Sequence, residues 1–430
     1  MKPAGYAIVG VVLGASACVL AAWGAAPPTT FDQLDLFSLA FSKVRADYVE
    51  PEPDSKLVDA AIQGMVAKLD PHSAYMDAKS FGGDFQVRTQ GHFGGVGIEV
   101  GQDAGVIRVI SAMDGMPAAG AGIKPEDRIT AINGMQVADH DFNESIDRMR
   151  GPVGTKVVLT IQRASEKKPF DVTLTRANVP FEAVTHHREG DIGYVRLPSF
   201  NEQTADGLEK AVRALKKEIG PNIRGYVLDL RNNPGGLLDQ AVQVSDDFLD
   251  AGEIVSTRGR HNADTQRFDA KPGDIADGKP VVVLINAGTA SASEIVSGAL
   301  QDHKRATILG MTSFGKGSVQ SILPLGEGRG ALRLTTARYY TPSGHSIQAQ
   351  GIIPDIQVAQ GDEVPKSLRY SEADLEGHLA GEPLPASRLN APVIYAAPGK
   401  KYDDFQLAYA LDILRGKMTV ASVTKPNPSL

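Results

Sequence analysis

Cysteine is almost missing from this chain, since Cys18 is the only one among 430 residues. It lies within the first 26 residues, so the rest of the chain has no thiol with which to form a disulfide. Long lysine or arginine clusters are also missing, and the formal net charge is -7 at pH 7. Because nucleic-acid binding depends on concentrated positive charge, we expect no nucleic-acid partner.

The overall composition is that of a soluble globular protein. Hydrophobic residues account for 42% of the sequence and charged residues for 22%. The chain exceeds the roughly 100–200 residues of a typical domain, which indicates two or three folding units.

The N-terminal segment, residues 1–26, carries Lys2 and then an uncharged run of mainly small and aliphatic residues. This pattern is typical of a signal peptide, and since roughly 20 apolar residues span a bilayer, the segment is also long enough for a membrane anchor. Both alternatives predict an exported protein that is periplasmic or anchored to the cell membrane facing outward. A lipid on Cys18 is less favoured, because the preceding Ala-Ser-Ala contains no large aliphatic residue.

Apolar periodicity divides the remaining chain into four parts. Residues 31–90 form a helical region, in which the break Pro51-Glu52-Pro53 separates two helices. Residues 91–179 contain short β-branched runs divided by glycine turns, with one helix inside the module. Residues 180–360 alternate apolar strands with helices, which predicts an α/β layer arrangement. Residues 361–430 form a C-terminal extension with a helix near Phe405–Leu414. The expected fold class is therefore a multidomain α+β protein.

One segment, residues 281–302, combines a buried strand, a turn of small residues and a helix: VVVLINAGTASASEIVSGALQD. A serine in such a turn lies at the edge of a sheet, beside the N–H groups and the positive end of a helix. Ser291 and Ser293 are both candidate nucleophiles, although a lone serine here is more often only a helix cap. A Ser-His-Asp triad is not expected, because no GxSxG motif occurs and His303 lies about 17 Å from the helix start.

A neutral lysine can act as the base for such a serine, because an amine buried among apolar groups loses its proton more readily. Lys316 is the candidate, since it lies between two glycines, after the strand-like RATILG and before the alternating SVQSILPL. Gln320 follows on the same side of an extended run and can orient the amine. Alone, Lys316 would be interpreted as a solvated surface charge and Gln320 as an exposed strand residue.

Two loops complete the candidate chemistry. GYVLDLRNNPGG, residues 225–236, ends in glycines whose N–H groups can approach a carbonyl oxygen, so it is a candidate oxyanion hole, although a plain loop is also compatible. Gly310–Gly317, GMTSFGKG, nearly matches a phosphate-binding loop. Nucleotide binding is less favoured, because Gly317 replaces the hydroxyl that holds Mg²⁺ and a strand-like segment follows.

These blocks resemble the carboxyl-terminal processing, or tail-specific, peptidases, a family of Ser-Lys endopeptidases that carry a PDZ domain. TASASE, residues 289–294, resembles the family's Ser-Ala-Ser-Ala-Ser-Glu block and departs from it only at Thr289. SFGKGSVQ, residues 313–320, and LDLRNNPGG resemble two further blocks, and KLDPHSAYM, residues 68–76, resembles the N-terminal helical region. The resemblance covers roughly Phe31 to Val358.

The resemblance implies a core like the layered fold of ClpP and crotonase, and a Ser-Lys dyad. Ser291 is the expected nucleophile, Lys316 its base and Gln320 the helper of Lys316. The oxyanion hole would use the N–H of Ala292 with that of Gly235 or Gly236, and the donor glycine stays open. Asp302 is a weaker candidate for positioning the helix or Lys316. No metal and no organic cofactor is required.

Phe93–Val179 resembles the PDZ domain, which binds a peptide as an added strand and holds its terminal carboxylate by backbone N–H groups. The implied substrates are unfolded or flexible C-terminal tails of proteins, cleaved nearby through an acyl-enzyme. A catalytically silent peptide-binding scaffold of the same fold is the alternative, and the sequence leaves a homo-oligomer or an adaptor open. The residues expected to bind the peptide are those of the glycine-rich turn and the next strand: Gly94, Gly95, Val96, Gly97 and Ile98.

Overall fold

The computed structural model describes residues 28–81, 89, 92–103, 106–113, 115–139, 142–180, 183–360, 371–382, 393–396 and 402–418. The predicted signal or anchor segment, with Cys18, lies outside these residues, as does much of the C-terminal extension. No helix within the described ranges has both the length and the apolar character needed to cross a membrane. The chain divides into two compact units, Met1–Met65 and Val66–Leu430.

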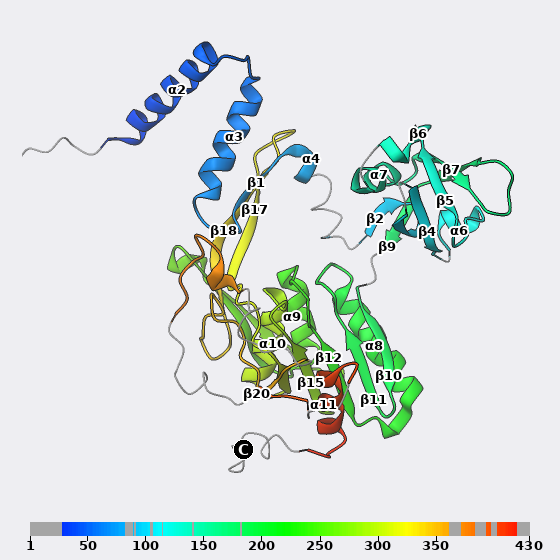
Figure 1. The fold of residues 1–430 in the computed structure, drawn as a ribbon. Helices are drawn as coiled ribbons and strands as arrows, with labels where there is room; N and C mark the ends of the chain where they lie inside the picture. The colour runs from blue at the N-terminus through cyan, green and yellow to red at the C-terminus, as the bar shows by residue number, and fades with distance from the viewer. Residues whose placement is uncertain are drawn as a thin grey trace, which may run out of the picture. The chain divides into compact units, whose positions relative to one another are not determined.

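The first unit contains the two predicted helices, α2 (Thr30–Asp47) and most of α3 (Asp54–Ala67) (Figure 1). The hydroxyl of Thr29 caps α2 by accepting from the Asp32 N–H at 3.3 Å, and the proline-containing break separates the helices. None of the residues of α2 is buried. The helix leaves apolar side chains exposed, among them Phe31, Leu34, Leu36, Phe37, Leu39 and Val44.

The β-rich module is a six-stranded antiparallel sheet with its own apolar core. Along its strand β7, Val157, Leu159 and Ile161 are buried and alternate with more exposed residues, as expected for a sheet with one buried face. The predicted helix is α7 (Phe142–Met149), and a short helix α6 (Pro117–Gly120) precedes it. The strands are β3 (Ile98–Asp103), β4 (Val106–Ala112), β5 (Arg128–Ile132), β6 (Met135–Gln136), β7 (Lys156–Gln162) and β8 (Phe170–Thr175).

The glycine-rich turn of this module is shorter than predicted. Gly94 and Gly95 belong to β2 (His92–Gly95), which pairs antiparallel with β9 (Ala177–Pro180) at the other end of the module. Only Val96 and Gly97 remain between β2 and β3. Gly97 has φ +74, and a Cβ there would lie 2.2 Å from the Cβ of Met116, so the turn requires glycine at this position.

The α/β core contains a seven-stranded sheet in the order β10-β11-β12-β15-β16-β19-β20. β10 runs antiparallel to β11, and the other neighbouring pairs are parallel. Every residue of β12 and β15 is buried, as expected for parallel strands covered on both faces. The strands are β10 (Thr185–Glu189), β11 (Ile192–Arg196), β12 (Gly225–Asp229), β15 (Val281–Ile285), β16 (Ala306–Gly310), β19 (Ile356–Val358) and β20 (Val393–Ile394).

Helices cover both faces of this sheet, which is the predicted layer arrangement (Figure 1). Neighbouring residues of β15 face opposite sides: Val283 joins the core beneath three of the helices, and Leu284 joins the core beneath the C-terminal helix. The three are α8 (Thr204–Ile219), α9 (Leu238–Asp246) and α10 (Ala292–Asp302), and the C-terminal helix is α11 (Phe405–Leu414).

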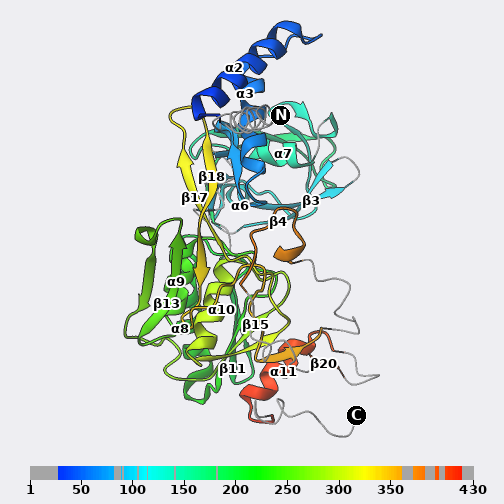
Figure 2. The same cartoon turned by 90° about the vertical axis from the view of Figure 1, so that its left-hand side faces the viewer.

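A second, five-stranded antiparallel sheet has the order β1-β18-β13-β14, and β17 also pairs with β18. β17 and β18 form a long hairpin, drawn in yellow in Figure 2. β1 comes from before the β-rich module and pairs with β18, with Ala74 opposite Arg333. A segment assigned from sequence to the N-terminal helical region is thus a strand of this sheet. The strands are β1 (Ala74–Met76), β13 (Gly252–Gly259), β14 (Gln266–Ala270), β17 (Ser318–Pro324) and β18 (Ala331–Tyr340).

Candidate active site

Ser291 lies where a buried strand passes into a helix. β15 ends at Ile285, and Ser291 immediately precedes α10. Its backbone is in the left-handed region with φ +55, which is uncommon for a residue other than glycine, and its side chain makes no capping hydrogen bond. The residue is 6% exposed. Its hydroxyl is therefore held at a helix N-terminus without being used to cap it.

The second candidate serine has a structural role. Ser293 is fully buried, and its Oγ donates to the backbone carbonyl of Asn233 at 3.1 Å. This bond ties the first turn of α10 to the loop after β12. Of the two serines, Ser291 is the one with a hydroxyl that makes no hydrogen bond to the backbone of the described residues.

Lys316 lies in the turn between β16 and β17, and Gln320 holds its amine. Lys316 Nζ donates to Gln320 Oε1 at 2.7 Å. Gln320 Nε2 in turn donates to Ser318 Oγ at 2.9 Å and to Thr335 Oγ1 at 3.1 Å. Burial, helped by the charge of Arg333, lowers the pKa of the Lys316 amine and outweighs nearby carboxylates. An amine of this kind loses its proton more readily than a solvated lysine does.

A buried carboxylate for which the sequence suggested no role joins the serine and lysine segments. Glu294 Oε2 accepts the N–H of Ser291 at 2.8 Å and the N–H of Lys316 at 2.9 Å. Its Oε1 accepts from Ser313 Oγ at 2.5 Å and from the Gly315 N–H at 2.7 Å. Since both nitrogens bond the same oxygen atom, Ser291 N and Lys316 N lie within about 6 Å of each other.

The hydrogen-bond partners of Glu294 are all neutral groups. Burial raises the pKa of Glu294 to about 7, although these four hydrogen bonds oppose the rise. The sequence feature that could have pointed to Glu294 was the Ser-x-x-Glu spacing of a capping box. Here the Ser291 N–H bonds the carboxylate, and the Glu294 N–H bonds the Ser291 carbonyl rather than its hydroxyl.

Ser291 and Lys316 lie near each other without a direct hydrogen bond. In the part of the chain that the structure describes, Lys316 Nζ bonds Gln320, and no hydrogen bond links it to Ser291 Oγ. Tyr339 is a further polar residue here, and its N–H donates to the Gly317 carbonyl at 2.8 Å. Burial raises the pKa of the Tyr339 phenol to about 12, partly opposed by the Ser291 hydroxyl beside it.

The loop after β12 approaches Ser291 closely. A Cβ on Gly235, where φ is +97, would lie 2.8 Å from Ser291 Cβ and 2.9 Å from Ala292 N, so glycine is required there. The Gly235 N–H donates to Asn233 Oδ1 at 2.8 Å. The N–H groups of Gly236 and Ala292 donate to no other residue in the described ranges. Of the two candidate glycines, Gly236 therefore has the available N–H.

The near match to a phosphate-binding loop has a different structure. A strand, β17, follows Gly317 where a phosphate-binding loop would continue into a helix. The N–H groups of Gly315 and Lys316, which would face a phosphate, donate to Glu294 instead. The nucleotide-binding alternative therefore has no structural support in this segment.

Of the two roles suggested for Asp302, positioning the helix or positioning Lys316, its contacts agree with the first and not with the second. Asp302 is the last residue of α10, at the opposite end from Ser291. Its Oδ2 accepts from the N–H of Ser343 at 3.0 Å and from its Oγ at 2.7 Å. His303 Nε2 bonds the Glu253 carbonyl at 2.8 Å. Both residues hold neighbouring turns of the fold.

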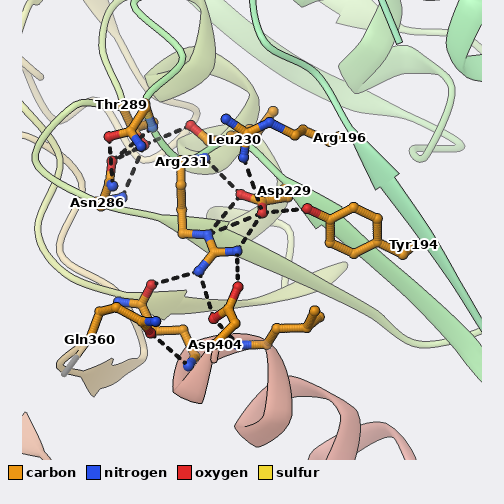
Figure 3. Close-up of polar contacts among 12 residues, drawn as sticks. Tyr194, Arg196, Asp229, Leu230, Arg231, Asn286, Thr289, Gln360 and Asp404 are labelled. Carbon is orange, nitrogen blue, oxygen red and sulfur yellow. Dashed lines mark hydrogen bonds and ion pairs between the residues drawn. The ribbon is translucent and has the colours of Figure 1, made fainter. Parts of the chain in front are cut away.

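A second polar cluster holds Arg231, which lies just before the loop that contains Gly235 (Figure 3). Arg231 Nη2 bonds Asp229 Oδ2 and Asp404 Oδ2, each at 2.6 Å. Asp229 also accepts from the Tyr194 hydroxyl at 2.7 Å, and Asp404 caps α11 by accepting from the Leu407 N–H at 2.9 Å. Burial acts to raise the pKa of Asp404, but its bonds with Arg231 hold it below the usual value. Arg231 thus ties α11 to the loop that contains Gly235.

Thr289, the one departure from the family-like block, is fully buried and hydrogen-bonded. Its Oγ1 donates to the Leu230 carbonyl at 2.8 Å and accepts from the Asn286 N–H at 3.0 Å (Figure 3). Its carbonyl accepts from the Phe314 N–H at 2.9 Å. Threonine therefore supplies the hydroxyl that serine would supply, and it links the Arg231 loop to the Lys316 turn.

The shortened turn in the β-rich module has free donors. The N–H groups of Val96 and Gly97 donate to no other residue within the described ranges, while their carbonyls accept from Ala118 and Met113. Val96 is buried, and Ile98 begins β3 as a half-buried residue. Unpaired N–H groups before a strand are what a peptide carboxylate requires.

No group of three or more His, Cys, Asp or Glu within the described ranges is arranged to hold a metal ion.

The family model for peptidase family S41 matches residues 191–358, and a PDZ domain model matches residues 108–163. A carboxy-terminal-processing protease from Bartonella bacilliformis is 48% identical over 432 residues, which cover 99% of this chain and 98% of that protein. The chain belongs to peptidase family S41. It is a carboxy-terminal-processing peptidase with a PDZ domain, as the motifs predicted.

A further family model, a further relative and a solved structure are also similar to this chain. The model for the N-terminal domain of activating protease CtpB matches residues 21–80. The carboxy-terminal processing protease CtpA of Bacillus subtilis is 37% identical over 347 residues, which cover 80% of this chain and 72% of that protein. Among solved structures, a photosystem II D1 C-terminal processing protease is 31% identical, with a TM-score of 0.43, and covers 76% of this chain and 93% of that one.

Proposed function

We propose that Ser291 is the nucleophile and Lys316 the general base of an acyl-enzyme mechanism. The observation that supports this most strongly is the single Glu294 oxygen that accepts the N–H groups of both residues, which keeps the two segments adjacent. The lowered pKa of the Lys316 amine supports its role as a proton acceptor. An amine that donates one N–H to Gln320 keeps its lone pair for the serine hydroxyl.

The reaction proceeds in two halves. Ser291 Oγ attacks the carbonyl carbon of the scissile bond while Lys316 takes the hydroxyl proton, and the N–H groups of Gly236 and Ala292 stabilise the oxyanion. Lys316 passes its proton to the leaving amine as the C–N bond breaks. Water then attacks the acyl-enzyme with Lys316 again as base, which releases the new carboxylate and restores Ser291. The Ser291–Lys316 hydrogen bond forms when substrate fills the site, since such bonds often tighten only in the complex.

The PDZ domain binds the flexible C-terminal tail of a protein substrate. The tail adds to the edge of β3, and the free N–H groups of Val96 and Gly97 hold its carboxylate. The apolar side chains of Val96 and Ile98 select an apolar terminal residue. The protein acts outside the cytoplasm, periplasmic or anchored through residues 1–26; the apolar N-terminal run supports this, and fractionation of cells tests it.

Ser291→Ala and Lys316→Ala test the dyad. Each should lower cleavage of an unfolded test protein by more than about 1,000-fold while the circular dichroism spectrum stays unchanged. Gln320→Ala should slow cleavage by roughly 10-fold, because it orients the base without accepting the proton. Near-normal turnover of Lys316→Ala at neutral pH would show that the base is another group. Active-site titration with a serine-reactive probe separates this enzyme from a silent scaffold, which would not be labelled.

A further inference from the structure

We propose that Asp70 is a positioning residue for Lys316, acting through a chain of hydrogen bonds that passes through Thr335 and Gln320. The proposal rests on the role of Lys316 as the base. It places part of the catalytic apparatus outside residues 191–358, because Asp70 lies in the segment matched by the N-terminal domain model.

The chain consists of three consecutive hydrogen bonds. Lys316 Nζ donates to Gln320 Oε1 at 2.7 Å, Gln320 Nε2 donates to Thr335 Oγ1 at 3.1 Å, and Thr335 Oγ1 donates to Asp70 Oδ1 at 3.0 Å. Asp70 and Thr335 are 265 residues apart in sequence. All three bonds run in the same direction, from the amine towards the carboxylate.

The carboxylate sets this direction. An ionised carboxylate only accepts hydrogen bonds, so the single hydroxyl proton of Thr335 points to Asp70. The hydroxyl oxygen then accepts from the amide NH₂ of Gln320, which leaves the Gln320 carbonyl facing Lys316. The amine is thus always offered an acceptor on Gln320, and this fixes the direction of one of its N–H groups. Without Asp70, the Thr335 hydroxyl and the Gln320 amide could both reverse.

Asp70 is itself held firmly in its charged form. It is 6% exposed and accepts the N–H groups of His72 and Ser73 at 2.9 Å each, and Ser73 Oγ at 2.7 Å. Burial would raise the pKa of Asp70, but its hydrogen bonds outweigh burial and keep the pKa below its usual value. Ser73 Oγ also accepts the Thr335 N–H at 3.0 Å, so the turn of Asp70 and strand β18 are fixed to each other.

Charges from four segments act on the Lys316 amine. Arg333 on β18 lowers its pKa, whereas Glu372 on the short helix η5 (Glu372–Asp374), Glu294 on α10 and Asp70 raise it. Glu372 is in turn bonded to His72 Nε2 at 2.7 Å. Removing the charge of Asp70 therefore takes away one group that favours the protonated amine. The pKa of Lys316 should fall further, and the acid limb of the pH–activity profile should move to lower pH.

Asp70→Asn in the full-length chain tests the proposal, because it keeps the shape of the side chain and removes its charge. We expect kcat/KM to fall roughly 10-fold at the pH optimum, with the acid limb shifted to lower pH, while the serine-reactive probe still titrates one site per chain. Glu327→Gln is the matched control, since Glu327 is an exposed carboxylate in the turn between β17 and β18. Its pH profile should superimpose on that of the parent.

A second pair of variants decides the matter should Asp70→Asn fold poorly. Thr335→Val removes the hydroxyl that relays the bond, and Thr335→Ser keeps it, so the valine variant should lose several-fold more kcat/KM. An unshifted acid limb in folded Asp70→Asn, or equal losses in the two Thr335 variants, overturns the proposal. If either result is found while Ser291→Ala and Lys316→Ala are inactive, only the role of Asp70 is refuted. If Ser291→Ala and Lys316→Ala are active, the dyad itself is refuted.

Discussion

Two buried carboxylate clusters hold the loops of the active site, and they balance charge in different ways. Asp404 shares the guanidinium of Arg231 with Asp229, whereas Glu294 accepts only from neutral N–H and O–H groups. Burial acts on Asp404 and Glu294 alike, yet the pKa of Asp404 is lowered and that of Glu294 is raised to about 7. The difference comes from the full positive charge of Arg231 and from the depth of burial, since the Asp404 side chain is 28% exposed and Glu294 is fully buried.

The contrast follows from what each cluster holds. The Arg231 cluster joins α11 to the loop that contains Gly235 through a charged pair. The Glu294 cluster joins Ser291 to Lys316. Neutral donors bind the two segments there without placing another cation beside an amine that has to lose its proton.

Breaking the charged cluster should have the largest effect on stability. Arg231→Met leaves Asp404 without its ion-pair partner and the fully buried Asp229 with only Arg196, at 3.6 Å, and we expect the free energy of unfolding to fall by about 3–5 kcal/mol in urea titrations. Arg213→Met is the control, because Arg213 pairs with Glu209 on an exposed face of α8. Its effect should stay within about 0.5 kcal/mol, and equal losses in both variants would contradict the comparison.

Breaking the neutral cluster should cost slightly less stability and more activity. Glu294→Ala leaves four buried donors without an acceptor, and each unsatisfied donor costs roughly 1–3 kcal/mol. Because water that enters the vacated space can satisfy some of them, we expect the free energy of unfolding to fall by about 3 kcal/mol. The loss in kcat/KM, expressed as a free energy, should be larger than this loss of stability, because Ser291 and Lys316 are no longer tied together. The measurement is urea unfolding alongside kcat/KM. Parent-like kcat/KM in a folded variant would show that Glu294 does not hold the pair.

The two clusters should respond to pH with opposite signs. Glu294 has a folded pKa of about 7 against an ordinary 4.5, so between these values the folded state binds more protons. Its contribution therefore falls by up to about 3 kcal/mol as pH rises from 4.5 to 7. Asp404 behaves oppositely, since its stabilisation is present above the ordinary value of 3.8 and is lost as pH falls through its lowered pKa.

Unfolding free energies measured against pH check this contrast. Glu294→Gln should remove part of the decline between pH 4.5 and pH 7, and Asp404→Asn should approach the parent only at acid pH. Identical pH slopes in the parent and Glu294→Gln would refute the raised pKa.

The smallest expected effect lies at the residue that links the clusters. Thr289→Val removes the hydroxyl bonded to Leu230 and Asn286 and should cost about 1–2 kcal/mol of unfolding free energy. Thr289→Ser keeps the hydroxyl and loses one buried methyl group, so it should cost about 1 kcal/mol or less. A serine variant less stable than the valine variant would mean that packing, not hydrogen bonding, decides this position.

Local pattern was enough to predict the α/β layers. The apolar runs of β12, β15 and β16 and the small-residue turn before α10 each lie within a short stretch of chain, and they form the elements that their spacing indicated. The contact between Lys316 and Gln320 also spans only four residues. Such features depend on neighbours in sequence, which is why they could be inferred without coordinates.

Contacts between distant segments could not be predicted in this way. Glu294 was assigned no role because its acceptor oxygens serve a turn some 20 residues away, at Gly315 and Lys316. β1 precedes the PDZ module in the sequence and β18 follows it, so their pairing joins residues that are far apart along the chain. Residue spacing alone left Ser291 and Ser293 open, and the family resemblance selected Ser291; the structural role of Ser293 depends on Asn233, which belongs to another loop.

The placement of β1 in the second sheet has a consequence for biosynthesis. Ribosomes deliver the Asp70 segment early, but its partner strand β18 begins only at Ala331, so β1 waits unpaired while most of the polypeptide is still being made. On the proposed mechanism the general base acquires its complete support only when that late hairpin arrives. A chain that ends before Ala331 would therefore lack this support, although it already contains both Ser291 and Lys316.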